Sequence, residues 1–287
     1  MYDGASPSDA VRLQRAVGEL RVSFKRRSDA TVLDGLRQAG CLKARFPRAV
    51  VPGWADVVTL NTSGGIASGD RLDSTFGVNE GAHATIAAQA AERFYRAYNA
   101  APPPASTPTP AHVRTRIDIA PGGAAEWLPQ ETILFDRCAV DRRLEVDIAG
   151  DGWFLGVECV VFGRAAMGEQ VAQAWLRDVI RIRHDGRLLL HDALRCDGDV
   201  AAVLAGRATA GGARALATLV HVGPAAEQAL EPVRAALAGV PDAAASAWNN
   251  MLLARILAPD SAALRLAVTA VLAALRGGRP LPRTWLC

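Results

Sequence analysis

The sequence is poor in the residues that build metal centres and disulfide frameworks. Its 287 residues include five cysteines and five histidines, which are scattered along the chain, and no two cysteines form a CxxC pair. An odd number of isolated cysteines favours reduced thiols, and histidines without close spacing argue against a zinc site. We therefore expect a cytoplasmic protein. Cys287, at the end of the chain, is interpreted as an incidental exposed thiol.

Long uncharged segments, a signal peptide and a basic excess are also missing. Hydrophobic residues make up 50% of the chain, yet no run of about 18 or more lacks a charge, so we expect no membrane-spanning helix. The first 20 residues contain acids and no apolar core, which argues against a secretory signal. With a formal net charge of +3 and 6% aromatic residues, nucleic-acid binding is not expected either.

The length and the order of the segments predict one domain over residues 1–287, which can bury a large core. Residues 1–18 are expected to form a flexible N-terminus. Residues 100–112 are rich in proline and predict an exposed loop, inserted between two strands because strand alternation resumes directly after it.

Apolar and polar residues alternate in many short segments, which is the period-two pattern of β-strands. The segments with this pattern are residues 20–25, 42–46, 57–60, 72–78, 113–119, 128–135, 144–148, 180–183 and 216–222. Residues 153–162 are apolar on both faces, as in a strand that is covered on each side. No alternation of strands and helices appears, so we expect a mainly β fold of antiparallel strands. Residues 82–96, rich in alanine, fit either strand or helix.

Helices are expected only towards the C-terminus. One is predicted over Pro224–Leu237, with a kink at Pro232. The strongest helical pattern is the last one, which begins at an Asp260 cap and ends before Gly277. Its apolar stripe could pack on the protein's own sheet or serve a partner protein.

A glycine-rich segment lies between two predicted strands, at residues 60–73. Gly64, Gly65 and Gly69 are followed by Asp70, and glycines at such spacing permit positive φ and close approach of another backbone. No Lys-Ser or Lys-Thr follows and no helix begins there, so the segment is not a phosphate-binding loop. A structural turn is the simplest interpretation.

Carboxylates stand inside otherwise apolar strands. Glu158 shares a face with Phe154 and Val160, and Glu131 shares one with Ile133. A lone buried carboxylate is costly, so each needs a cation, a polar partner or water. Two interpretations stay open: buried Glu–Arg ion pairs, with partners among Arg93, Arg137 and Arg164, or the lining of a hydrated cleft.

Two further functions are considered from the residues alone. Paired carboxylates could serve a carboxylate-based hydrolase acting on a small or glycosidic substrate, but such a site needs sugar-stacking aromatics, which are few. No GxSxG motif is present. A β-solenoid adhesion module is disfavoured because neither a secretion signal nor a repeat is evident.

Several motifs in one order give a more specific indication. They read LNTSGGIASGDRL, EGAHATIAAQAAERFYR, WLPQETILFD, FLGVECVVFGRAAMGE, GGARALATLVHVG and SAWNNMLLARILAPD. In this order the chain resembles the urease accessory protein family UreD, also called UreH, from about residue 20 to residue 287. It departs from the family at Ala67-Ser68, where members commonly have a bulkier residue and a third glycine.

The resemblance implies a β-helical scaffold that is not an enzyme and has no tightly bound cofactor. It implies that the alanine-rich segment is strand, and that the protein forms a hetero-oligomer with UreF, UreG and the urease apoprotein. It also implies that nickel passes through a hydrated interior on its way to the urease active site.

The resemblance marks five acidic positions as candidates for this passage, and two arginines and three glycines beside them. The acids are Asp70, Glu92, Glu131, Glu158 and Glu169, the arginines are Arg93 and Arg164, and the glycines are Gly64, Gly65 and Gly69. Asp70 and Glu158 are the favoured pair. We expect Asp70→Ala and Glu158→Ala to preserve the complex with UreF and to lower the nickel content of urease.

Overall fold

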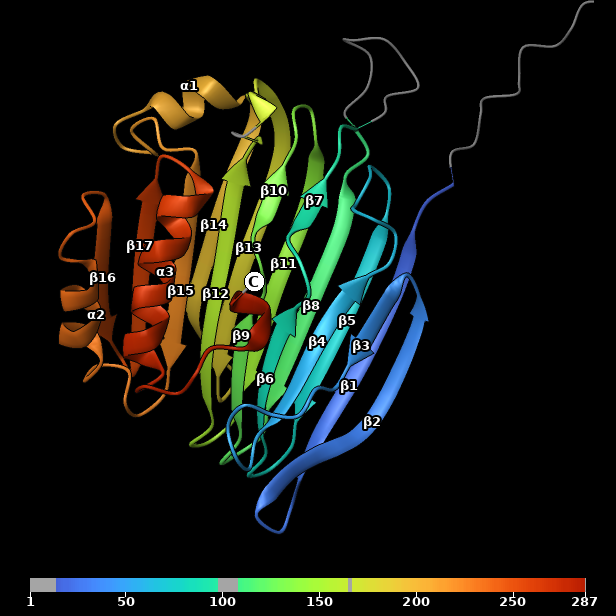
Figure 1. Ribbon diagram of the computed structural model, residues 1–287, viewed down its shortest axis with the longest axis vertical. Helices are drawn as coiled ribbons and strands as arrows, with labels where there is room; N and C mark the ends of the chain where they lie inside the picture. The colour runs from blue at the N-terminus through green and yellow to red at the C-terminus, as the bar shows by residue number, and fades with distance from the viewer. Residues whose placement is uncertain (1–13, 98–107, 165–166, 287) are drawn as a thin grey trace, which may run out of the picture.

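Two β-sheets pack face to face in the computed structural model, which describes residues 14–97, 108–164 and 167–286 (Figure 1). The first sheet has the order β14 (Arg187–Asp199), β13 (Gln173–His184), β11 (Ala139–Ile148), β8 (Ala111–Ile119), β5 (Arg71–Val78), β1 (Val17–Arg27), β2 (Ala30–Gly40). The main path of the second is β16 (Ala243–Trp248), β17 (Met251–Ala258), β15 (Ala215–Val222), β12 (Trp153–Phe162), β9 (Ala124–Leu128), β6 (His83–Ala88), β4 (Ala55–Asn61), β3 (Leu42–Arg45). Two short strands, β7 (Glu92–Phe94) and β10 (Thr132–Leu134), pair with each other beside β12.

The chain coils between the two sheets. Along the main path from β4 to β13, successive strands alternate between the second sheet and the first, so neighbours within each sheet run parallel. Antiparallel pairs occur towards the ends of the coil, as in β1–β2 and β13–β14. The mainly β, β-helical prediction is confirmed, but the sheets are mixed and not antiparallel throughout. Period-two alternation reports which face a side chain takes and says nothing of strand direction, which explains the difference.

Apolar residues form two cores on either side of the second sheet. One core lies between the sheets and contains Phe24, Phe76 and Phe154. The other lies between the second sheet and the helices, and contains Leu155 and Val268. Because β12 faces both cores, its residues are buried on both sides, as the apolar run predicted.

Two helices, α2 (Leu230–Leu237) and α3 (Ser261–Leu275), cover the outer face of the second sheet (Figure 1). α3 (Ser261–Leu275) begins as predicted, where the Asp260 side chain accepts a 2.9 Å hydrogen bond from the Ala263 amide. Its apolar stripe is buried against the sheet, so this stripe is not free for a partner. α2 (Leu230–Leu237) is shorter than predicted: turns precede it, and Pro232 stands in its first turn, where proline does not break a helix. α1 (Val200–Ala205) and a 3₁₀ turn (Arg283–Trp285) were not expected.

Other predicted boundaries are corrected or fall outside the described residues. The alanine-rich segment forms β6 and β7, as the resemblance implied. The segment 128–135 is two strands, since Leu128 ends β9 and β10 begins at Thr132. β8 begins at Ala111, so the last two residues of the expected proline-rich loop belong to this strand. Of the N-terminus that was expected to be flexible (residues 1–18), Val17 and Gly18 belong to β1, and residues 1–13 lie outside the description. Residues 98–107 and Cys287 also lie outside it.

Candidate functional site

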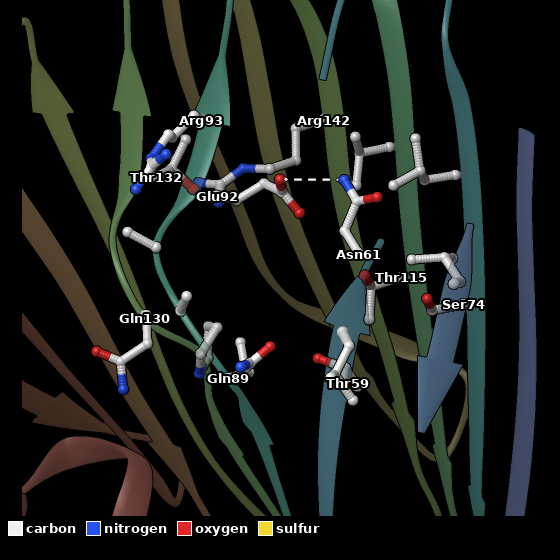
Figure 2. A pocket seen from close by; sticks show the side chains of 18 of the residues that line it. Thr59, Asn61, Ser74, Gln89, Glu92, Arg93, Thr115, Gln130, Thr132 and Arg142 are labelled. Atoms are coloured by element: carbon white, nitrogen blue, oxygen red, sulfur yellow. Dashed lines mark hydrogen bonds between the residues drawn. The ribbon is translucent and has the colours of Figure 1, made fainter. Parts of the chain in front are cut away.

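A cavity of about 270 Å³ lies between the two sheets, and polar side chains stand among the apolar residues that line it (Figure 2). The polar residues come from strands of both sheets and from the links β6–β7 and β9–β10: Thr59, Asn61, Ser74, Gln89, Glu92, Arg93, Thr115, Gln130, Thr132, Arg142, Arg143 and Glu158. Hydroxyl, amide and carboxyl groups thus replace the hydrocarbon that normally fills the interior of a two-layer β structure. Polar groups of this kind offer hydrogen-bond partners to water in an interior space.

The hydroxyl groups stand at inward positions that would otherwise be apolar. Ser74 on β5 and Thr115 on β8 are register partners, and the next partners in the same row are Leu20 and Leu144. Both leucines belong to the core between the sheets. The row therefore changes from apolar to polar and back within one sheet, and the two hydroxyl residues border the cavity.

Glu92 is the carboxylate of the cavity that has no guanidinium partner. Its Oε1 accepts a hydrogen bond of 3.2 Å from the Asn61 amide, and it forms no ion pair with any of the residues that the structure describes. Burial raises the pKa of Glu92 to about 7, although the Asn61 hydrogen bond and the charge of Arg93 act in the opposite direction. Near neutral pH this group can be charged or neutral.

Glu158 is held by a network that joins the two sheets. Its Oε1 accepts from Trp127 Nε1 at 2.7 Å, and its Oε2 lies 2.6 Å from Arg142 Nη1. The same guanidinium binds both oxygens of Asp178, with Nε donating to Oδ1 at 3.0 Å, and donates to Thr132 Oγ1 at 2.6 Å. Burial raises the pKa of Glu158, and the Arg142 charge works against that rise.

A second cavity, of about 450 Å³, lies on the other side of this network. Its lining includes Glu158, Asp178, Asp192, Thr218 and Arg255. Arg255 forms an ion pair with Asp192 and donates a long hydrogen bond to Thr218 Oγ1. Since Glu158 borders both cavities, the two spaces are separated at the Glu158–Arg142–Asp178 network.

Asp70 has a different place from the one predicted. It is buried, its Oδ1 accepts from the Ala16 amide at 2.8 Å, and its Oδ2 accepts from the Ala67 amide at 2.7 Å. It does not border either of these cavities. Through these two hydrogen bonds, Asp70 fixes the glycine loop to the segment that precedes β1.

Two other candidate acids are paired with arginines away from the cavity. The Glu131 Oε1 atom lies 3.3 Å from Arg265 Nη1 on α3, and the Glu169 Oε2 atom lies 2.6 Å from Arg164 Nε. Ion pairs thus account for Glu131, Glu158 and Glu169. Of the suggested partners, Arg164 is correct, whereas Arg137 pairs with its neighbour Asp136 and Arg93 borders the cavity without an ion pair to the described residues.

The glycine loop forms one edge of the first cavity through Gly64 and Gly65. Gly65 has φ +139°, and a Cβ placed there would lie 2.4 Å from the Tyr95 ring. The Tyr95 hydroxyl donates to the Gly64 carbonyl at 2.8 Å. Gly64 and Gly69 also have positive φ, as the sequence indicated. The loop is therefore a structural turn that lies against an aromatic ring at the rim.

Sequence reasoning missed several residues of the site, although a signal for two of them was present. The alternation that puts Leu144 and Val146 inside also puts Arg142 inside, and the alternation of Ile180 and Ile182 does the same for Asp178. A buried cluster on the outer face of the second sheet was also missed: Glu126 is 0% exposed and binds Arg276 and Arg279.

Neither a cluster of metal ligands nor a membrane-spanning helix occurs in the described part of the chain. Within the described ranges, no three His, Cys, Asp or Glu side chains gather closely enough to hold a metal ion. No helix in this part of the chain is long and apolar enough to cross a membrane. The cavities can therefore offer oxygen ligands and water to a cation, but no ready-made high-affinity site in these ranges.

Comparison with known proteins gives one consistent family. The family model described as UreD urease accessory protein matches residues 16–286. A urease accessory protein UreD of Xanthobacter autotrophicus is 42% identical over 282 residues, covering 98% of this chain and 93% of the relative. Those of Dinoroseobacter shibae and Cereibacter sphaeroides are 43% and 45% identical, covering 99% and 95% of this chain and 95% and 96% of the relative.

Proposed function

This chain belongs to the UreD family of urease accessory proteins, so its role is accessory to the maturation of urease and it is not itself an enzyme. On that premise we propose that it is a scaffold which binds the urease apoprotein and the UreF–UreG complex, and which lets nickel pass between its two sheets. The carboxylate-based hydrolase is not proposed, because the family is one of accessory proteins.

The polar cavity between the sheets is the observation that supports a passage. Its hydroxyl, amide and carboxyl oxygens can replace part of the water around a divalent cation, and ligands of this kind hold nickel weakly. A cluster of imidazoles and thiolates would hold the ion tightly and stop it. Weak, hydrated sites are what transit requires, because the ion must leave as readily as it enters.

The second cavity continues the space between the sheets towards the edge formed by β14 and β16. Acidic groups border it on strands of both sheets, Glu158 on β12 and Asp178 on β13. Together the two cavities mark a route across the strands, within the layer between the sheets. Nickel is the cargo of this route and not a resident cofactor.

The test replaces one of the hydroxyl residues that line the first cavity with a large side chain, which fills the cavity. Thr115→Phe places an aromatic ring in the cavity, and we expect it to lower the nickel content of urease co-expressed with the accessory proteins. The matched control is Arg116→Phe on the same strand, because Arg116 points out of the sheet and its side chain is 54% exposed. The control should give wild-type nickel content.

Nickel per urease active site, measured by elemental analysis, is the readout, and co-purification with UreF confirms that each variant still assembles. Ser74→Phe fills the same space from the neighbouring strand and replaces Thr115→Phe if that variant does not fold. Wild-type nickel content in a folded, assembled cavity-filling variant would refute the passage.

A further inference from the structure

The Arg142 guanidinium stands between the two cavities. Arg142 borders the first cavity and Asp178 borders the second, while Glu158 borders both. Arg142 is on β11 and Asp178 is its register partner on β13, whereas Glu158 reaches them from β12 of the opposite sheet. The network therefore bridges the layer between the sheets at the point where the spaces would join.

A guanidinium fixed at this point opposes the passage of a cation. It carries a full positive charge, and inside a protein that charge is screened much less than in water. Because a single cation holds the two carboxylates of Glu158 and Asp178, the network has a formal charge of −1 when both are ionised. The two acids would attract a divalent cation if the guanidinium were to withdraw.

A second acceptor for the guanidinium lies on the side of the first cavity. Thr132, which accepts a hydrogen bond from Arg142 Nη1, is the register partner of Glu92 on the neighbouring parallel strand. In-register neighbours in a sheet lie about 5 Å apart and point to the same face. Figure 2 shows the side chains of Arg142, Thr132 and Glu92 together in the wall of the cavity.

We propose that Arg142 is a gate that exchanges partners. In the closed state its guanidinium binds Glu158 and Asp178 and separates the cavities. In the open state it withdraws into the first cavity and pairs with Glu92, which frees the two acids for a passing divalent cation. This inference rests on the proposed nickel passage and identifies the residues that control it.

Glu92 is suited to the role of alternative partner. Its carboxyl group forms a hydrogen bond with the Asn61 amide and no ion pair among the described residues, so it is available to a cation. The cost of leaving it charged in the cavity falls when a guanidinium arrives, and the pair compensates part of the cost of leaving Glu158 and Asp178. The cavity of about 270 Å³ gives the side chain room to move.

The test uses Glu92→Gln in two backgrounds, in the full chain co-expressed with urease and the other accessory proteins. Glu92→Gln alone removes the open-state partner, and we expect nickel content in urease to fall about fivefold, the size of effect that coupled neighbours produce. In the background Arg142→Gln, which removes the guanidinium that Glu92 would bind in the open state, Glu92→Gln should cause no further change.

Dependence on the background is a result that a merely structural role of Glu92 would not give. Unchanged nickel content in Glu92→Gln overturns the gate, and so does an equal fall in both backgrounds. If the Arg142→Gln background does not fold, Thr132→Val replaces it, because it removes one hydrogen bond of the closed state. The effect of Glu92→Gln should then be smaller than in the wild type, and an undiminished effect contradicts the gate.

The cavity-filling variant Thr115→Phe separates failure of the gate from failure of the passage. If Thr115→Phe lowers nickel content while the Glu92 effect does not depend on the background, the passage remains and the gate falls. If a folded Thr115→Phe variant also leaves nickel content unchanged, the passage itself falls.

Discussion

Two glutamates border the same cavity and have opposite electrostatic surroundings. Glu158 shares the Arg142 guanidinium with Asp178, whereas Glu92 has an amide as its hydrogen-bond partner. An ion pair offsets the cost of burying a carboxylate, and an amide does so only in part. The presence of a neighbouring guanidinium, and not the residue type, therefore decides how the charge of each glutamate is compensated.

This difference gives Glu92 a measurable effect on the pH dependence of stability. Its pKa of about 7 in the folded chain is above the ordinary value of 4.5, so between these values the folded state binds more protons than the unfolded state. The stability that Glu92 contributes is complete below pH 4.5 and is lost as pH rises through 7. We expect this loss to be at most about 3 kcal/mol.

Glu92→Gln cannot ionise and should not show this loss. Its free energy of unfolding, measured with urea at pH 5 and at pH 8, should exceed that of the wild type by a larger margin at pH 8. Parallel pH dependence in the two proteins would contradict the assigned environment of Glu92. The same data show whether the variant folds well, which the nickel experiment requires.

At the scale of an element, two adjacent glycines of the glycine loop differ in backbone conformation and in their contacts. Gly64 has φ +80° and open space where a Cβ would be, whereas Gly65 has φ +139° and the Tyr95 ring in that place. An alanine at Gly64 has only backbone strain to overcome. An alanine at Gly65 must also displace an aromatic ring, and with it the Tyr95–Gly64 hydrogen bond.

We therefore expect Gly65→Ala to destabilise the chain more than Gly64→Ala. The backbone strain alone costs about 1–3 kcal/mol at a position of this kind. Chemical denaturation of both variants measures the difference, and Gly64→Ala is the matched control because it alters the adjacent residue of the same turn. Equal losses would show that the ring of Tyr95 moves aside without cost.

At the scale of the whole molecule, a buried contact joins β9 to the segment after α3, which is about 150 residues later in the sequence. Glu126 on β9 is completely buried and accepts hydrogen bonds from Thr85 at 3.0 Å, Arg276 at 2.8 Å and Arg279 at 2.8 Å. The Arg279 guanidinium also lies 4.8 Å from the centre of the Trp54 ring. The segment after α3 is thereby fixed to the second sheet.

Breaking this contact should be costly. Glu126→Gln leaves Arg276, which is 3% exposed, without its carboxylate, and the loss of one partner of a buried pair costs about 3–5 kcal/mol. The control is Glu131→Gln, whose ion pair with Arg265 is partly exposed and is expected to contribute about 1 kcal/mol or less. Urea unfolding compares the two, and similar losses would contradict the role of Glu126.

Each sequence pattern could predict only the structural feature on which it depends. Period-two alternation located many strands and put Glu158 on the inner face, and the Asp260 cap located α3. The alternation did not locate β2, β16 or β17, where small or charged residues interrupt the apolar face of the strand. Asp70 and Glu131 could not be placed, since a carboxylate held by backbone amides or by an arginine looks the same in sequence as one that lines a cavity.

The sequence alone determined the family, the β class and the faces of many strands, because these depend on local patterns and on the order of motifs. Only the tertiary structure decided that the strands run mainly parallel in a coil between two sheets, and that Arg142, Glu158 and Asp178 meet between two cavities. The reason is physical: burial and pKa depend on contacts between strands that are far apart along the chain, and alternation carries no information about which strands become neighbours.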